Sequence, residues 1–305
     1  MTAAIRIGEE VADGLATGGA VVALETSVIG QGLPHPRNVE CLERMSAAIR
    51  RSDAVPAWVG VHDGEVVVGL SAAELETLCE PGRAEKVARR DLPAACTRGG
   101  LGATTVSATI WAAARVGIHV GATGGIGGVH RGARPDVSGD LLELSRTPGL
   151  LVCSGPKSIV DPVATVERLE ELGVSLVGYG VDRMPFFLVR ETAVTLEHRV
   201  DSPAEAARLA AAARALDTGS TVLLCTPVPA ADAIVPEDVA AAVAAAEEAV
   251  ERAAVGGRDR TPALLAALDE ATDGRSIEAN LALLASNAAL AGEVAAALSR
   301  QDGGG

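Results

Sequence analysis

Short apolar segments alternate with longer segments of helical periodicity along most of the chain, and this alternation constrains the fold more than any other feature. Such an order is typical of an α/β sheet protein. His62, Asp63 and Gly64 separate two of the apolar segments and predict a β-hairpin. We therefore predict an α/β fold, with a mixed central sheet flanked by helices in a three-layer αβα arrangement. The predicted strands are 20–25, 56–61, 65–70, 118–122, 149–154, 174–179 and 220–225, and the predicted helices are 37–52, 71–80, 103–117, 138–146, 158–173, 203–217, 235–254, 261–272 and 277–299.

No Pro- or Ser-rich linker and no repeat divides the 305 residues, so we expect residues 1–300 to form a single domain and 301–305 to be a disordered tail. No segment approaches the roughly 20 uncharged apolar residues that span a bilayer. The acidic N-terminus is not that of a signal peptide. The five cysteines form no CxxC pair, which is typical of a reduced cytoplasmic protein. We expect no membrane partner.

The charged residues are unusual in kind as well as in number. A net charge of −14 disfavours binding of polymeric nucleic acid, because Lys and Arg contacts with phosphate carry most of that affinity. Of the 26 basic residues, only Lys86 and Lys157 are lysines. Arginine cannot supply an amine nucleophile. The two lysines are therefore candidates for amine chemistry, although a biased genome would also leave two by chance.

Two segments in the first third of the chain carry candidate site residues. Glu25 ends an apolar strand, and ligands of α/β sheets bind beyond the carboxyl ends of strands, so Glu25 is a candidate acid or base. Lys86 lies in a cationic cluster, and Thr105 opens a predicted helix whose N-terminus favours a phosphate. A surface carboxylate, a helix cap and a solvated basic face are the alternatives.

The glycine-rich segment 121–141 offers His130, Asp136, Ser138 and Asp140 after a predicted strand. Its glycine spacing does not fit a dinucleotide-binding loop. One carboxylate with water ligands suits Mg²⁺ or Mn²⁺, but the two aspartates fit helix-capping positions equally well.

Lys157 follows a buried strand and Ser-Gly-Pro, and it begins a predicted helix. Desolvation and the positive helix N-terminus both disfavour an ammonium there, so we predict a nucleophilic amine that forms a Schiff base with a sugar aldehyde. A surface lysine in a loop is the alternative.

Together with GYGVDRMPFF at 178–187, TPVP at 226–229 and SIEANLALLASNAALAGEVA at 276–295, these segments make the chain similar to the pseudouridine-5′-phosphate glycosidases, a family that includes the indigoidine-cluster A-type proteins. The resemblance runs from about residue 21 to residue 295. It implies a homotrimer with a divalent metal, Mn²⁺, that reversibly breaks the C–C bond between ribose 5-phosphate and uracil. It also implies residue roles: Glu25 as proton donor, Lys157 as nucleophile, Asp136 as metal ligand, and Lys86, Thr105, Val106, His130, Ser138, Gly139, Asp140 and Asn280 as substrate-binding residues.

The chain departs from the family pattern around this machinery. Thr26-Ser27 stands where the family has Ser-Thr, and Thr226 stands where it has Asn. We therefore predict a C-glycosynthase that attaches ribose 5-phosphate to an aromatic, polyketide-type acceptor. The alternatives are a catabolic glycosidase that releases uracil and a non-catalytic phosphosugar-binding protein.

Overall fold

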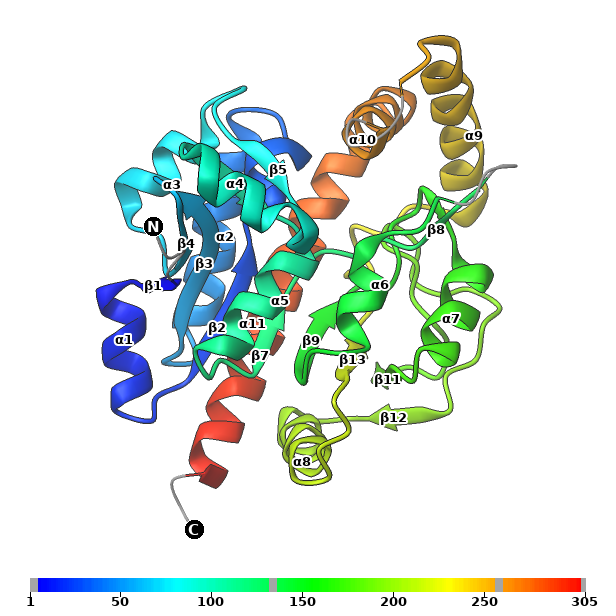
Figure 1. Cartoon of the computed structure of the whole chain (residues 1–305). Coiled ribbons are helices and arrows are strands. Elements are labelled where there is room, and N and C mark those ends of the chain that lie inside the picture. Colours follow the sequence, from blue (N-terminus) through cyan, green and yellow to red (C-terminus); the bar gives the residue numbers. More distant parts are fainter. Residues whose placement is uncertain (1–4, 132–135, 256–259, 303–305) are drawn as a thin grey trace.

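The structure of the protein is a computed structural model that describes residues 5–131, 136–255 and 260–302. Within these residues, eleven strands form one mixed sheet whose main path runs β1-β4-β3-β2-β7-β9-β13-β11-β12 (Figure 1). The neighbours along the path are parallel except for β3 and β4, and β6 adds antiparallel to β3 with β5 parallel beside it. The strands are β1 (Ile5–Ile7), β2 (Val21–Glu25), β3 (Val55–His62), β4 (Glu65–Val68), β5 (Glu85–Val87), β6 (Leu101–Thr104), β7 (Val120–Ala122), β9 (Gly149–Cys153), β11 (Ser175–Tyr179), β12 (His198–Val200) and β13 (Thr221–Cys225), and a separate pair joins β8 (Val129–His130) to β10 (Val160–Asp161).

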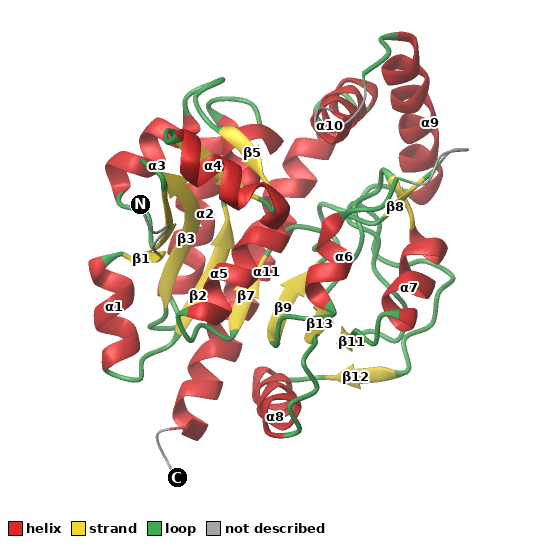
Figure 2. Cartoon of the chain, in the orientation of Figure 1, coloured by secondary structure: helices red, strands yellow, loops and turns green. Residues whose placement is uncertain are grey.

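Helices cover both faces of this sheet, so the predicted αβα layering is confirmed (Figure 2). Alternate residues of β2 show the reason: Val22 and Leu24 pack into one core cluster, whereas Val21 and Ala23 pack into another on the opposite face. One face carries α2 (Arg37–Arg50), α3 (Ala72–Cys79), α8 (Pro203–Ala215), α9 (Pro236–Arg252), α10 (Arg260–Ala271) and α11 (Arg275–Asp302), and the other carries α1 (Glu9–Ala16), α4 (Leu92–Arg98), α5 (Val106–Arg115), α6 (Gly139–Leu144) and α7 (Pro162–Glu171).

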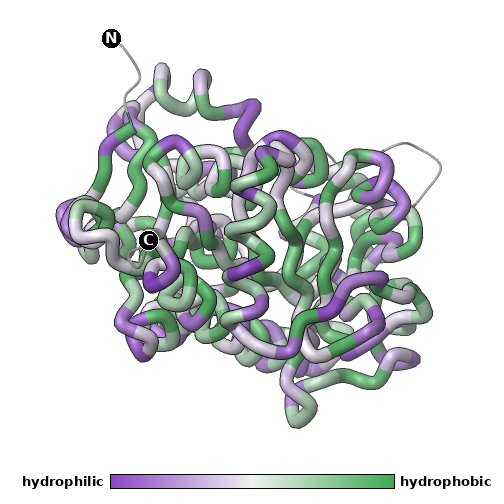
Figure 3. Tube along the Cα trace, turned by 90° about the horizontal axis from the view of Figure 1, so that it is seen from below, coloured by the Kyte–Doolittle hydropathy of each residue, from purple (hydrophilic) through white to green (hydrophobic). Residues whose placement is uncertain are grey.

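Helix α11 is the core helix of the first layer. It packs against α2, α8 and strands β2, β7 and β9. Among the described residues it is the one helix long and apolar enough to cross a membrane, and 67% of its most apolar window is buried inside the protein. Much of the central trace is hydrophobic in the view of Figure 3. The contacts of α11 are those of a core helix rather than of a membrane span.

All seven predicted strands and all nine predicted helices are present, and the predicted hairpin joins β3 to β4. Asp63 and Gly64 both have positive φ, as the two central residues of a type I′ turn require. The prediction missed the short strands β1, β5, β6, β8, β10 and β12 and the helices α1 and α4.

Three predicted boundaries are wrong by three or more residues, and the others differ from the structure by at most two. The helix expected from residue 103 begins at Val106, because residues 101–104 form β6. The helix expected from residue 158 begins at Pro162, with the Asp161 side chain capping it, so Lys157 does not begin a helix. Helix α11 extends to Asp302, so the first two residues of the expected tail are helical, and 303–305 lie outside the described residues.

Candidate active site

A cavity of about 260 Å³ lies beyond the carboxyl ends of β2 and β7. The next strand in the chain after β2 is β3, its neighbour on one side. The neighbour on its other side is β7, from which the sheet continues through β9 and β13. The strand order therefore changes direction between β2 and β7. Ligands of open α/β sheets bind at such points. Of the predicted site residues, all except Val106 line the cavity: Glu25, Lys86, Thr105, His130, Asp136, Ser138, Gly139, Asp140, Lys157 and Asn280.

Glu25 ends β2 with its side chain buried, 4% exposed. Ser27 donates a 2.6 Å hydrogen bond to Oε2 of Glu25, and Thr123, just after β7, donates to Oε1. Each carboxylate oxygen therefore has a hydroxyl partner from a different segment. Glu25 is held in one orientation at the floor of the cavity, as a general acid or base requires.

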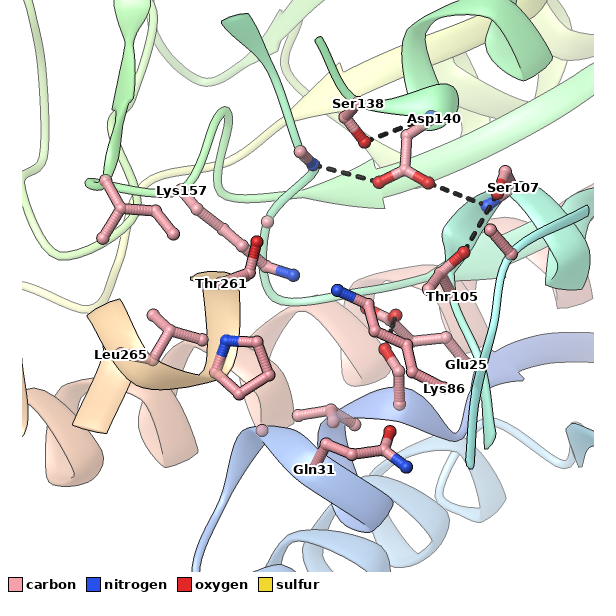
Figure 4. Close-up of a pocket in the computed structure, with 18 of the residues that line it drawn as sticks. Glu25, Gln31, Lys86, Thr105, Ser107, Ser138, Asp140, Lys157, Thr261 and Leu265 are labelled. Carbon is pink, nitrogen blue, oxygen red and sulfur yellow. Dashed lines mark hydrogen bonds between the residues drawn. The ribbon is translucent and has the colours of Figure 1, made fainter. Parts of the chain in front are cut away.

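The two lysines approach the cavity from different elements. Lys86 is the middle residue of β5, and Lys157 lies between β9 and β10 (Figure 4). Figure 4 shows both amines directed into the cavity and toward each other. Burial lowers the pKa of Lys86, and the charge of Lys157 lowers it further, while Asp140 and Glu25 oppose the shift.

Lys157 is positioned by a turn rather than by a helix. Gly155 has φ +77°, and a Cβ there would lie 2.0 Å from the carbonyl oxygen of Pro185, so no other residue fits this turn. The amide of Lys157 donates to the carbonyl of Ile126 at 3.0 Å. The glycine-rich loop therefore fixes the backbone of the lysine, and the helix-dipole part of our prediction is wrong.

Asp140 joins two segments of the site. Its Oδ1 accepts from the amide of Ser107 in α5 at 3.0 Å, and its Oδ2 accepts from the amide of Gly127 at 3.1 Å. Ser138 caps α6 and accepts from the amide of Asp140 at 3.2 Å. The carboxylate of Asp140 thus accepts the hydrogen bond of an amide near the start of α5, where the sequence predicts that a phosphate binds.

Of the three residues around the start of α5, Thr105 presents its side chain to the cavity, whereas Thr104 and Val106 have side chains buried in the protein. The side chain of Thr105 faces the cavity and lies 3.0 Å from the hydroxyl of Ser107. Thr104 is fully buried in β6 and donates a 2.6 Å hydrogen bond to the carbonyl of Val59. The side chain of Val106 is buried in a core cluster, so only its backbone is available to a substrate.

His130 and Asp136 lie together at one side of the cavity, where the amide of His130 donates to the carbonyl of Asp136 at 2.8 Å. Burial lowers the pKa of His130, although Asp136 opposes the shift. The described residues hold no cluster of three or more His, Cys, Asp or Glu side chains that could bind a metal. The exposed carboxylate of Asp136 fits a different type of site, in which Mg²⁺ or Mn²⁺ binds one carboxylate, waters and a substrate phosphate.

Two amide side chains that line the cavity each have a buried oxygen without a hydrogen-bond partner. Asn280 in α11 is 8% exposed, and neither its Oδ1 nor the Oε1 of Gln31 has a hydrogen-bond partner among the described residues. Asn280 is one of the predicted site residues, whereas Gln31 is not. The one signal for Gln31 in the sequence is its position between two glycines shortly after Glu25. A buried acceptor without a partner is costly, so both atoms call for a donor from a ligand.

Comparison with known proteins gives one consistent family. Residues 10–297 match the family model described as indigoidine synthase A like protein. A pseudouridine-5′-phosphate glycosidase of Gemmatimonas aurantiaca is 46% identical over 294 residues, which is 96% of each chain. A protein of the same name from Sorangium cellulosum is 43% identical over 298 residues, covering 97% of this chain and 94% of the relative.

Two solved structures share the fold over almost the whole chain. The prealnumycin C-glycosynthase AlnA in complex with ribulose 5-phosphate is 38% identical, with a TM-score of 0.90 and 99% of each chain covered. An indigoidine synthase A-like protein of Thermotoga maritima is 37% identical, with a TM-score of 0.89, and the match covers 98% of this chain and 97% of that protein.

Proposed function

This chain belongs to the family of indigoidine synthase A-like proteins, and on that premise we propose that it cleaves pseudouridine 5′-phosphate into uracil and ribose 5-phosphate. The observation that carries the proposal is the convergence of Glu25, Lys86 and Lys157 on one cavity. A proton carrier, a phosphate-binding cation and an amine are the groups that cleavage of a C-glycoside of a sugar phosphate needs.

A C-glycoside has no leaving oxygen to protonate, so the two-carboxylate mechanism of ordinary glycosidases does not apply. In the proposed reaction the amine of Lys157 bonds to C1′ and displaces the ring oxygen, and the proton that the nitrogen loses goes to that oxygen. Glu25 then protonates C5 of uracil. The electrons of the C1′–C5 bond return to the uracil ring as the lysine nitrogen forms an iminium with C1′, and water releases ribose 5-phosphate from that iminium.

We expect the phosphate to be bound by Lys86 and by the hydroxyls of Thr105 and Ser138, which line the cavity. This contact would hold the open sugar near Lys157, where orientation lowers the barrier. Asp136 is the residue to hold a divalent metal, Mn²⁺ by family resemblance. Such a metal would neutralise negative charge on the sugar phosphate.

The proposed direction of the reaction, cleavage, differs from the direction that the sequence predicts, synthesis. We predicted synthesis on an aromatic acceptor, but curated relatives at 43–46% identity are named glycosidases. The unpartnered Oδ1 of Asn280 also favours a base with N–H donors over an apolar aromatic ring. C-glycosynthesis stays the second candidate, because AlnA has the same fold at 38% identity.

The two lysines provide a matched test. Incubation with ribose 5-phosphate and borohydride should add the mass of the reduced sugar to Lys157 in the wild type and in Lys86→Arg, with a higher sugar concentration needed in the variant. Lys157→Arg keeps the charge but should show neither labelling nor release of uracil. Labelling at any other residue, or uracil release by Lys157→Arg, would refute the Schiff-base mechanism.

Two further parts of the proposal come from composition and family resemblance. We propose a cytoplasmic protein, consistent with five free cysteines. We also propose a homotrimer, which sedimentation analysis would test.

A further inference from the structure

Gln31 is held in a way that fixes which of its atoms faces the cavity. It belongs to a five-residue π-helical turn, Val28–Gly32, closed by the amide of Leu33, which donates to the carbonyl of Val28 at 3.0 Å. Its Nε2 donates to the carbonyl of Ala84 at 2.8 Å. Only an amide nitrogen can donate to a carbonyl, so this bond assigns Oε1 to the cavity side. Figure 4 shows the oxygen of Gln31 turned toward the side of the cavity where Glu25 and Lys86 lie.

The Oε1 of Gln31 and the Oδ1 of Asn280 reach the cavity of Glu25 from different segments of the chain. Glu25 ends β2, which lies between β3 and β7. Because β4 occupies one edge of β3 at residues 59–62, β6 pairs with residues 60–62 on the same edge as β2, beyond the carboxyl end of β2, and β5 lies beside β6. Asn280 lies against Gly124, just after β7, and Gln31 is bonded to Ala84, just before β5. The cavity that contains the proton-delivering carboxylate therefore has two acceptors without partners, each positioned by a different segment.

Pseudouridine has a matching arrangement of donors. Its sugar is bonded to C5, and the two ring positions meta to C5 are N1 and N3, which both carry a hydrogen. A ring placed with C5 at Glu25 offers two N–H donors to the cavity, one for each unpartnered oxygen. We propose, on the basis of the proposed function, that Gln31 determines base specificity by accepting from one ring N–H while Asn280 accepts from the other.

This pairing would separate pseudouridine 5′-phosphate from uridine 5′-phosphate. In uridine the sugar is bonded to N1, and the meta positions are N3–H and C5–H. One of the two acceptors then stays buried without a donor, whichever way the ring turns. A site built around polar groups rejects a ligand that leaves them unpaired far more strongly than an apolar pocket rejects a change in shape.

The test uses pseudouridine 5′-phosphate and its N1-methyl and N3-methyl analogues, with kcat/KM measured for each. The wild type should reject both analogues by about 100-fold or more. Gln31→Ala should lower kcat/KM for the unmodified substrate by about 10- to 100-fold and should largely remove the discrimination against one analogue only. Asn280→Ala should do the same for the other analogue.

Borohydride trapping of ribose 5-phosphate at Lys157 serves as the control for folding and for the sugar site. Gln31→Ala should trap the sugar at the same concentrations as the wild type, because Gln31 contacts the base. If both variants relieve the same analogue, or if Gln31→Ala relieves neither, Gln31 does not read the base and the inference is overturned. If the wild type traps the sugar but cleaves none of the three substrates, the proposed function fails and this inference fails with it.

Discussion

Replacement of Asp140 by Asn tests whether this carboxylate holds the site together or contacts the substrate directly. In the structure its two oxygens accept from the amides of Ser107 and Gly127 at 3.0 and 3.1 Å, and the side chain is 6% exposed. Asparagine has nearly the same shape but one acceptor and one donor group. One of the two backbone amides would then face an NH₂ group and lose its partner.

The expected loss of stability follows from these two hydrogen bonds. An unpaired buried donor costs about 1–3 kcal/mol, and the remaining bond loses the extra strength that a charged acceptor gives it, about 1 kcal/mol. We therefore expect Asp140→Asn to lower the free energy of unfolding by about 2–4 kcal/mol. Asp140→Ala, which leaves both donors unpaired, should lower it by about 2–6 kcal/mol.

Urea unfolding of the two variants measures these losses, and Ser138→Ala provides a local comparison. That variant removes a single hydroxyl cap of α6 and should cost about 1 kcal/mol. An Asp140→Asn variant that keeps wild-type stability within about 0.5 kcal/mol but no longer binds ribose 5-phosphate would refute the reasoning. The carboxylate would then be a direct ligand contact.

Three other predictions concern groups around the same cavity. Burial lowers the pKa of Lys86 in the folded protein below its ordinary value of 10.5, so the unfolded chain binds more protons at alkaline pH. The free energy of unfolding of the wild type should therefore increase relative to that of Lys86→Met as the pH rises toward 10.5. A difference between the two proteins that does not change with pH in urea unfolding contradicts this. Chelator should abolish uracil release and Mn²⁺ should restore it, with a higher Mn²⁺ concentration needed in Asp136→Ala; chelator-insensitive turnover would remove the metal from the proposal. Asn287→Ala should lower the free energy of unfolding by about 2–4 kcal/mol, because the fully buried Asn287 donates to the carbonyl of Thr123 at 2.8 Å and to Ser154 at 3.1 Å; an unchanged urea midpoint would contradict it.

The local patterns of the sequence determined the element types and the residues most suited to chemistry. Apolar segments of five to eight residues became strands such as β2, β3 and β9. Helical periodicity located the long helices, and Asp63-Gly64 located the hairpin. The scarcity of lysine singled out Lys86 and Lys157, and both line the cavity. These features depend on residues close together in the chain, so they can be recognised without knowledge of the fold.

Short elements could not be predicted from such local patterns. β6 has four residues, Leu-Gly-Ala-Thr, without a β-branched run, and it is a strand because it pairs with β3. Thr104 consequently lies in the core with a bond to the carbonyl of Val59 rather than at a helix start. The true start of α7 did have a local signal, the capping Asp161 before Pro162, but the apolar pattern extended past it.

Only the tertiary structure decided which chemical groups meet and what each can do. Glu25 and Thr123 are 98 residues apart and share a hydrogen bond because β2 and β7 are neighbours in the sheet. Parallel strands are joined by long crossovers, so their order is set by packing over the whole sheet and leaves no local pattern. The lowered pKa of Lys86 and the unpartnered oxygen of Gln31 have the same origin, since burial and hydrogen bonding depend on segments that are distant in the chain.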